Sequence, residues 1–140
     1  MSDAVYHDRI KDLARAATGA GRLAAPARVA TVDNPLCGDK VRVELRLDGD
    51  LVAELGHEVR GCMLCQAAAA VLATHAPGHD AAALAAVRAE LAAMLRDEGP
   101  APAGEWADLG AFLPVRRHKS RHDCVLLPFT AAERALSEPG

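Results

Sequence analysis

The segment DKVRVELRLDGDLVAELGHEVRGC, residues 39–62, predicts the centre of the fold. Its first part alternates strictly between apolar and charged residues, which is the period of a half-buried strand. The apolar positions on one face are Val41, Val43, Leu45 and Leu47. After the turn residues 48–50, apolar residues alternate again at Leu51, Ala53, Leu55 and Val59. Two alternating runs joined by a short Asp-Gly-Asp turn predict an antiparallel hairpin.

The segments on either side of the hairpin predict one more strand and two helices. Upstream, ARVATVDNP (27–35) has weak strand character, and apolar residues at helical spacing over 5–17 predict an opening helix that Gly19 stops. Downstream, the alanine run that begins at Cys62 favours a helix, because alanine loses no side-chain entropy there. Pro77 and Gly78 are expected to end it.

The last third of the chain is predicted to be helical. Asp80 is expected to cap a helix with an apolar stripe at Leu84, Val87, Leu91, Met94 and Leu95. A short helix is expected over 105–113 and is expected to break at Pro114, followed by a basic segment. A final helix is expected from about Cys124 or Phe129 to Ser137, with Thr130 and Glu133 spaced as a capping box. This order predicts an α+β fold, a small antiparallel β-sheet of about three strands with helices packed on it.

Length and composition narrow the class of protein. The chain has 140 residues, of which 51% are hydrophobic, so we expect one domain over residues 1–140. The formal net charge of −3 and the 3% aromatic content give no indication of a nucleic-acid or membrane partner. The start, MSDAVYHDRIKDLARAA, is charged throughout, unlike a secretory signal, and no apolar run approaches the length of a membrane span. We therefore expect a cytoplasmic protein.

Three of the four cysteines fall at the ends of predicted elements. Cys37 lies in the turn before the hairpin, Cys62 at the start of the alanine-rich helix, and Cys124 at or near the start of the last helix. Free N–H groups at a helix start favour the thiolate, which is the form that binds a metal. Asp39 follows Cys37 across Gly38, and glycine allows the backbone to aim two neighbouring side chains at one point. A metal could hold these side chains together.

The same residues also fit simpler roles. A single cysteine is usually a small buried hydrophobe. Cys62 and Cys65 form a C-x-x-C pair, which redox enzymes also carry. A structural zinc ribbon would need a second such pair, and the sequence has none. The basic segment 116–122 is either a solvated loop or a source of positive charge that stabilises a Cys124 thiolate. It has no aromatic residues on which nucleic-acid bases would stack.

Three motifs together resemble the IscU/NifU N-terminal family of iron–sulfur cluster assembly proteins. They are NPLCGDKVRVELRLDGD (34–50), VRGCMLCQAAAA (59–70) and RHDC (121–124). The likeness is greatest to the SufU branch, because about twenty extra residues separate the second family cysteine from the third. IscU scaffolds also have a ligand histidine directly before that third cysteine, where this chain has Asp123. The usual first-helix motif of the family is replaced here by LARAATG (13–19).

The resemblance to SufU implies a site and an activity. It implies a tetrahedral Zn²⁺ site formed by Cys37, Asp39, Cys62 and Cys124, with Arg121 close to it. Three thiolates and a carboxylate suit zinc, which takes sulfur and oxygen ligands and is not redox active. It further implies a sulfurtransferase that accepts persulfide sulfur from a SufS-type cysteine desulfurase and passes it to downstream iron–sulfur assembly proteins. Cys124 is the expected sulfur acceptor and Arg121 the group that stabilises its anion.

Two other functions remain as alternatives. The same residues would suit a scaffold on which a [2Fe–2S] cluster is assembled, or a zinc module that only docks to a partner. The missing histidine before Cys124 and the inserted segment count against the scaffold. Cys65, three residues past Cys62 on the helix, is expected to be a core residue or a spare thiol rather than a ligand.

Overall fold

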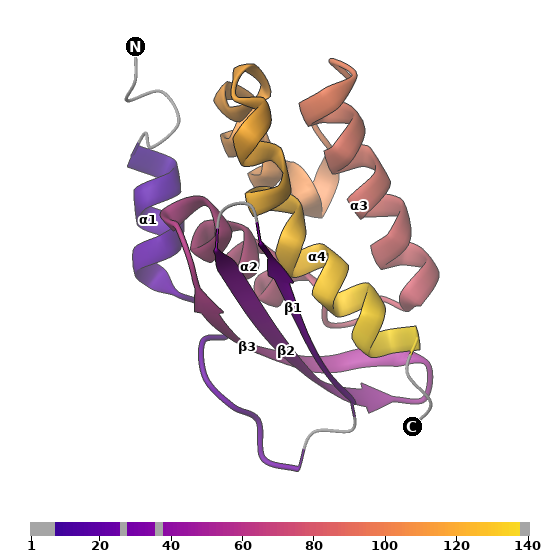
Figure 1. The fold of residues 1–140 in the computed structure, drawn as a ribbon. Helices are drawn as coiled ribbons and strands as arrows, with labels where there is room; N and C mark the ends of the chain where they lie inside the picture. Colours follow the sequence, from indigo (N-terminus) through magenta and orange to yellow (C-terminus); the bar gives the residue numbers. More distant parts are fainter. Residues whose placement is uncertain (1–7, 26–27, 36–37, 138–140) are drawn as a thin grey trace.

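The computed structural model of the chain describes residues 8–25, 28–35 and 38–137. Three strands come first after an opening helix, and the rest of the described chain is helical (Figure 1). The elements are α1 (Asp8–Ala16), β1 (Arg28–Asn34), β2 (Asp39–Asp48), β3 (Leu51–Arg60), α2 (Met63–His75), α3 (Ala81–Arg96), η2 (Gly104–Arg117), η3 (Lys119–Arg121) and α4 (His122–Ser137). The predicted α+β class and the three-stranded sheet are therefore confirmed.

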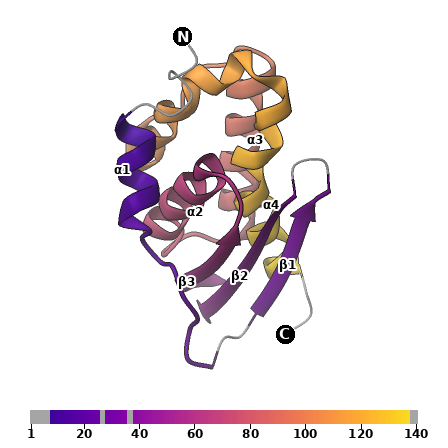
Figure 2. The same cartoon turned by 60° about the vertical axis from the view of Figure 1, so that its left-hand side comes forward.

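The sheet is a meander in which each strand pairs with its neighbour in sequence. Its order is β1-β2-β3 and both pairs are antiparallel. Helices α2 and α4 pack against the sheet, while α1 lies against α2 and α3 against α4 (Figures 1 and 2). Residues 67–70 of α2 are four alanines with at most 1% exposure, so small side chains let this helix lie close to its neighbours. None of the described helices has both the length and the apolar character to cross a membrane.

The hairpin forms as predicted, and Leu55 and Val59 of its second strand face the core as expected, but the expected inward face is wrong at the start of that strand. Val41, Val43 and Leu45 of β2 are fully buried, as expected. In β3, however, Leu51 is 43% exposed and Val52 is buried. The register changes between Arg46 and Leu47, where Leu47 pairs with Val52 instead of continuing the alternation. A bulge inserts one extra residue, so the side chains at the start of β3 lie on the opposite face from the one that strict alternation predicts.

One predicted helix end and one predicted helix cap are wrong, while the last helix does start near Cys124, one of the two starts expected. The short helix does not break at Pro114, because η2 is a 3₁₀ helix that continues to Arg117. The fixed φ of proline is compatible with 3₁₀ geometry. Thr130 is not a helix cap, because α4 begins eight residues earlier at His122. Its hydroxyl instead donates to the carbonyl of Leu126, one turn back in the same helix. The predicted cap of α3 is confirmed, since Asp80 accepts from the N–H of Ala83.

The connection from α1 to β1 crosses β3 and reaches β2, and we call its residues 17–25 the strap. His57 holds it three times: its N–H donates to Gly19, its carbonyl accepts from Gly21, and its Nε2 donates to the Thr18 carbonyl at 2.8 Å. Glu44 holds it further along by accepting from the N–H of Leu23 at 2.9 Å. The strap accounts for the burial of Glu44, which lies on the charged face of the alternating β2 and is nevertheless only 2% exposed.

Burial and hydrogen bonds change the pKa values of His57 and Glu44, the two residues that hold the strap. Burial lowers the pKa of His57, and the bond to Thr18 offsets this only in part. Its Nδ1 is buried without a hydrogen-bond partner among the described residues, so a proton there would have no acceptor. Burial by itself would raise the pKa of Glu44. The bonds from Leu23 and Arg42, together with the charges of Arg42 and Arg22, outweigh it, and the pKa is lowered.

The protein is expected to lose stability as the pH falls through the range below about 6.5, the usual pKa of histidine. A lowered pKa in the folded state means that the unfolded chain binds more protons at His57, so the free energy of unfolding rises with pH through this window. Urea unfolding at several pH values should show this slope, and His57→Gln should flatten it. The exposed His118→Gln is the control and should keep it. An equal slope in the wild type and His57→Gln would exclude His57 as the source.

Candidate metal centre

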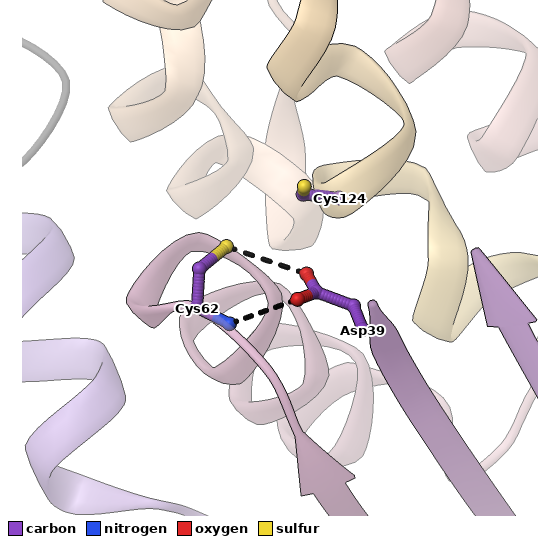
Figure 3. A group of neighbouring side chains, drawn as sticks. All are labelled: Asp39, Cys62 and Cys124. Carbon is purple, nitrogen blue, oxygen red and sulfur yellow. Dashed lines mark hydrogen bonds between the residues drawn. The ribbon is translucent and has the colours of Figure 1, made fainter. Parts of the chain in front are cut away.

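Three side chains from distant parts of the chain converge above the end of the sheet. Asp39 is the first residue of β2, Cys62 joins β3 to α2, and Cys124 lies in the first turn of α4. One donor atom from each, a carboxylate oxygen and two Sγ atoms, lies within 4.8 Å of the other two. Figure 3 shows the three side chains pointing toward one another. The fold thus brings together residues that are up to 85 positions apart, from Asp39 to Cys124.

Asp39 and Cys62 are joined directly. The Sγ of Cys62 donates to Oδ2 of Asp39 at 3.4 Å, and its backbone N–H donates to Oδ1 at 3.2 Å (Figure 3). Cys62 is the N-cap residue of α2 and has extended backbone angles. Its N–H therefore lies outside the helical ladder and needs an acceptor, which Asp39 supplies. These bonds fix the carboxylate at the start of the helix.

Gly61 makes this approach possible because it has no side chain. A Cβ placed on Gly61 would lie 2.6 Å from Cγ and 2.7 Å from Oδ1 of Asp39. Carbon atoms do not come that close without displacement of one group. Asp39 is 4% exposed, so its carboxylate has little room to move aside. Glycine directly before Cys62 is a requirement of the site.

Gly61→Ala is expected to lower the free energy of unfolding by about 1–3 kcal/mol, because the new methyl group overpacks the site and pushes Asp39 away. Urea denaturation measures this change. Gly110→Ala is the matched control, since a Cβ there would meet only Ala101 at 3.7 Å, an ordinary contact. The control should stay within about 0.5 kcal/mol of the wild type. Equal stability of both variants would contradict the tight approach.

The donor set suits a thiophilic cation. Two thiols and a carboxylate are ligand types that zinc accepts in a tetrahedron, and a fourth donor would complete it. Cys124 is fully buried and Cys62 half-buried, so a cation would be shielded from water on the side of α4. Gly38, with a positive φ of +79°, forms the turn directly before Asp39 and allows the chain to bend there.

The remaining residues singled out from the sequence fall in three places. Cys37 lies outside the described residues. Arg121 is the last residue of η3, half-buried and one turn before Cys124. Cys65 is fully buried in the core, as expected of a core residue. Asp123 is directed to α3, where its Oδ1 forms an ion pair with Arg96 at 2.5 Å.

Sequence reasoning missed the contribution of Gly61 to this centre. The residue type of Cys62 indicates a metal ligand, whereas the glycine before it was given no part in the site. A glycine between a strand and a cysteine-capped helix is itself a signal of close backbone approach. The direction of Asp123 had no sequence signal, because it depends on the packing of α3 beside α4.

Comparisons with known proteins agree with this fold. Residues 5–113 match the family model described as the NifU-like N-terminal domain. The crystal structure of a NifU-like protein (N-terminal) from Brucella abortus is similar, with a TM-score of 0.91 and 40% identity over 96% of this chain and 94% of that chain. A protein from Fervidobacterium islandicum described as an iron–sulfur cluster assembly scaffold protein for the SUF system (FiSufU) shares the fold, with a TM-score of 0.88 and 23% identity over 98% of this chain and 100% of that chain.

Two curated proteins are also similar in sequence. The zinc-dependent sulfurtransferase SufU of Bacillus subtilis is 26% identical over 79% of this chain and 75% of its own length. The bifunctional protein NifU/MnmA of Rubrobacter xylanophilus is 36% identical over 61% of this chain, which corresponds to only 18% of that longer protein. The family match covers most of the chain, and the resemblance noted from its motifs is confirmed. The chain belongs to the family of NifU-like N-terminal domains, with SufU proteins among its relatives.

Proposed function

We propose that this protein is a zinc-dependent sulfurtransferase that accepts persulfide sulfur from a SufS-type cysteine desulfurase for iron–sulfur cluster assembly. The observation that carries the proposal is the convergence of Asp39, Cys62 and Cys124 at one point. The relation to the zinc-dependent sulfurtransferase SufU of B. subtilis supports it. Zn²⁺ is the proposed metal, held by these three residues together with Cys37.

Each residue has a proposed part in the site. When bound, zinc would keep the cysteines deprotonated near neutral pH. Asp39 is held in place by the N–H of Cys62 and keeps its carboxylate aimed at the two sulfurs. Arg121 supplies positive charge one turn before Cys124. Cys124 is the proposed acceptor, and because it is fully buried, the start of α4 has to open locally before sulfur can reach it.

The transfer itself is a thiol–persulfide exchange. The Cys124 thiolate attacks the terminal sulfur of the persulfide on the desulfurase cysteine. A new S–S bond forms on Cys124 while the S–S bond of the donor breaks. The donor cysteine leaves as a thiolate that takes the electron pair of the broken bond. No outside oxidant or reductant is consumed.

The alternative function is a scaffold for a [2Fe–2S] cluster. In IscU scaffolds the residue before the third cysteine is a ligand histidine, whereas Asp123 of this chain is tied to Arg96 on α3. Because Asp123 pairs with Arg96, it does not take the place of that ligand histidine, and this favours the sulfurtransferase over the scaffold.

Metal analysis of protein purified without oxygen tests the proposal. An equimolar content of zinc and a colourless solution are expected. Visible absorption from an iron–sulfur cluster, with iron in place of zinc, would instead support the scaffold. The protein should be measured as purified, since oxidation or acid releases metals from thiolate sites.

A further inference from the structure

A large open groove lies beside the candidate metal centre, on the side of α3. It has a volume of about 980 Å³ and is formed by the C-terminal end of α3 and the segment that leads into α4, which lie together at one end of the molecule (Figure 1). We call it the basic groove. The lining residues that matter here are Arg96, Leu113, Pro114, Arg116, Arg117 and Lys119.

The basic groove has a strongly positive lining in a chain whose net charge is −3. Among the described residues that line it, Glu98 is the only acidic one. Within the part of the chain that the structure describes, neither Arg117 nor Lys119 forms an ion pair, and both side chains are exposed. Two neighbouring cations without a carboxylate partner favour an anionic ligand.

Two other cations of the groove are committed to the fold. Arg116 donates through its guanidinium to the carbonyls of Met94 and Gly99, and so holds the end of α3. Arg96 is paired with Asp123. The charge available to a ligand therefore comes chiefly from Arg117 and Lys119.

The groove also offers an apolar contact. Leu113 is 38% exposed, and among the described residues Leu51 is the only other large hydrophobic side chain that is exposed. Pro114 lies next to it in the lining. Of the described residues in this lining, none is a Phe, Tyr or Trp on which a nucleic-acid base would stack. Positive charge beside an apolar wall fits a peptide segment that combines carboxylates with an apolar side chain.

The groove and the candidate metal centre share a wall. His122 lines the groove, and its Nε2 is held between the carbonyls of Val115 and Arg116 at 3.1 and 3.0 Å. Cys124 follows two residues later and faces the other side, toward Cys62. A protein that occupies the groove would therefore be positioned beside the residue proposed to accept sulfur.

We propose that the basic groove binds a segment of the protein that donates sulfur to Cys124, and that this segment is acidic and carries an apolar side chain. This inference rests on the proposed function for the identity of the partner. The chemistry of the groove alone determines the class of ligand.

The first test uses a labelled peptide of Glu-Glu-Leu repeats and fluorescence anisotropy. The wild type should bind it with an affinity that falls as salt rises, and R117E/K119E should bind it at least about tenfold more weakly, corresponding to about 1.4 kcal/mol. The matched control K11E/R15E makes the same change of charge on α1, outside the groove, and should bind within about twofold of the wild type. Thermal unfolding checks that each variant is folded.

Three results of this titration would overturn the proposal. One is equal binding by the wild type and R117E/K119E. Another is equal affinity for the matching Gln-Gln-Leu peptide, because charge would then not matter. The third is tighter binding of an oligothymidylate than of the acidic peptide, which would assign the groove to nucleic acid.

The second test concerns the partner and uses a cysteine desulfurase loaded with persulfide. At low desulfurase concentration, the rate of sulfur acceptance should fall in R117E/K119E by the same factor as peptide affinity and stay unchanged in K11E/R15E. Unchanged acceptance in R117E/K119E would show that the donor does not use the groove. A wild type that binds the acidic peptide but accepts no sulfur would refute the proposed function while supporting the ligand class of the groove.

Discussion

Cys124→Ser is expected to abolish the stimulation of cysteine turnover that the wild-type protein gives a cysteine desulfurase. Serine cannot take a persulfide, so the donor would keep its sulfur and could not turn over again. Turnover is measured as alanine or sulfide released with and without the protein. Binding of Cys124→Ser to the desulfurase should persist, which separates loss of chemistry from loss of docking.

Cys65→Ser is the matched control, because it makes the same chemical change one turn into α2. Cys65 is fully buried among the alanines of that helix, outside the converging group of donors. The Cys65→Ser variant should therefore keep most of the stimulation of cysteine turnover. Stimulation that survives in Cys124→Ser and disappears in Cys65→Ser would make the C-x-x-C pair the working site instead.

If the site holds zinc as proposed, its removal is expected to lower the melting temperature by about 8 °C or more. The site joins the start of β2, the start of α2 and the start of α4, so metal binding adds directly to folding stability. A ligand present at about 100 times its dissociation constant stabilises the folded state by about 2.7 kcal/mol. For a chain of this size, roughly 3 °C of melting temperature corresponds to each kcal/mol. Calorimetry with and without a chelator measures the shift.

Asp39→Ala should weaken zinc binding and reduce this shift without removing it, because the proposed cysteine ligands remain. It should also lower stability in the presence of chelator, since the N–H of Cys62 loses its acceptor. Asp33→Ala, at an exposed position of β1, is the control. Unchanged zinc content and melting behaviour in Asp39→Ala would remove Asp39 from the ligand set.

Local patterns predicted most of the fold because they act within single elements. The alternation of β2, the alanine run of α2 and the cap Asp80 all rest on neighbours in sequence, and each was confirmed. The errors arose where distant packing decides. The strap that covers Glu44 comes from a segment 21 positions away. The bulge that buries Val52 depends on how β2 and β3 pair, which the pattern of one strand does not contain.

The candidate site was predictable in its membership more than in its geometry. Asp39, Cys62 and Cys124 were identified because their residue types and motifs point to metal chemistry, and the fold does bring them together. The need for Gly61, the pairing of Asp123 with Arg96 and the basic groove follow from how β3, α3 and α4 pack. Of these features only Gly61 had a sequence signal, its place between a strand and a cysteine-capped helix, whereas the ion pair and the groove depend on the three-dimensional arrangement.

The position of the transferred sulfur decides whether Cys124 is the acceptor. The wild-type protein is incubated with a cysteine desulfurase and cysteine, alkylated, digested and examined by mass spectrometry. We expect an added sulfur on the peptide that contains Cys124. Sulfur found instead on Cys62, which is more exposed than Cys124, or on Cys65, with Cys124 unmodified, would contradict the proposed mechanism.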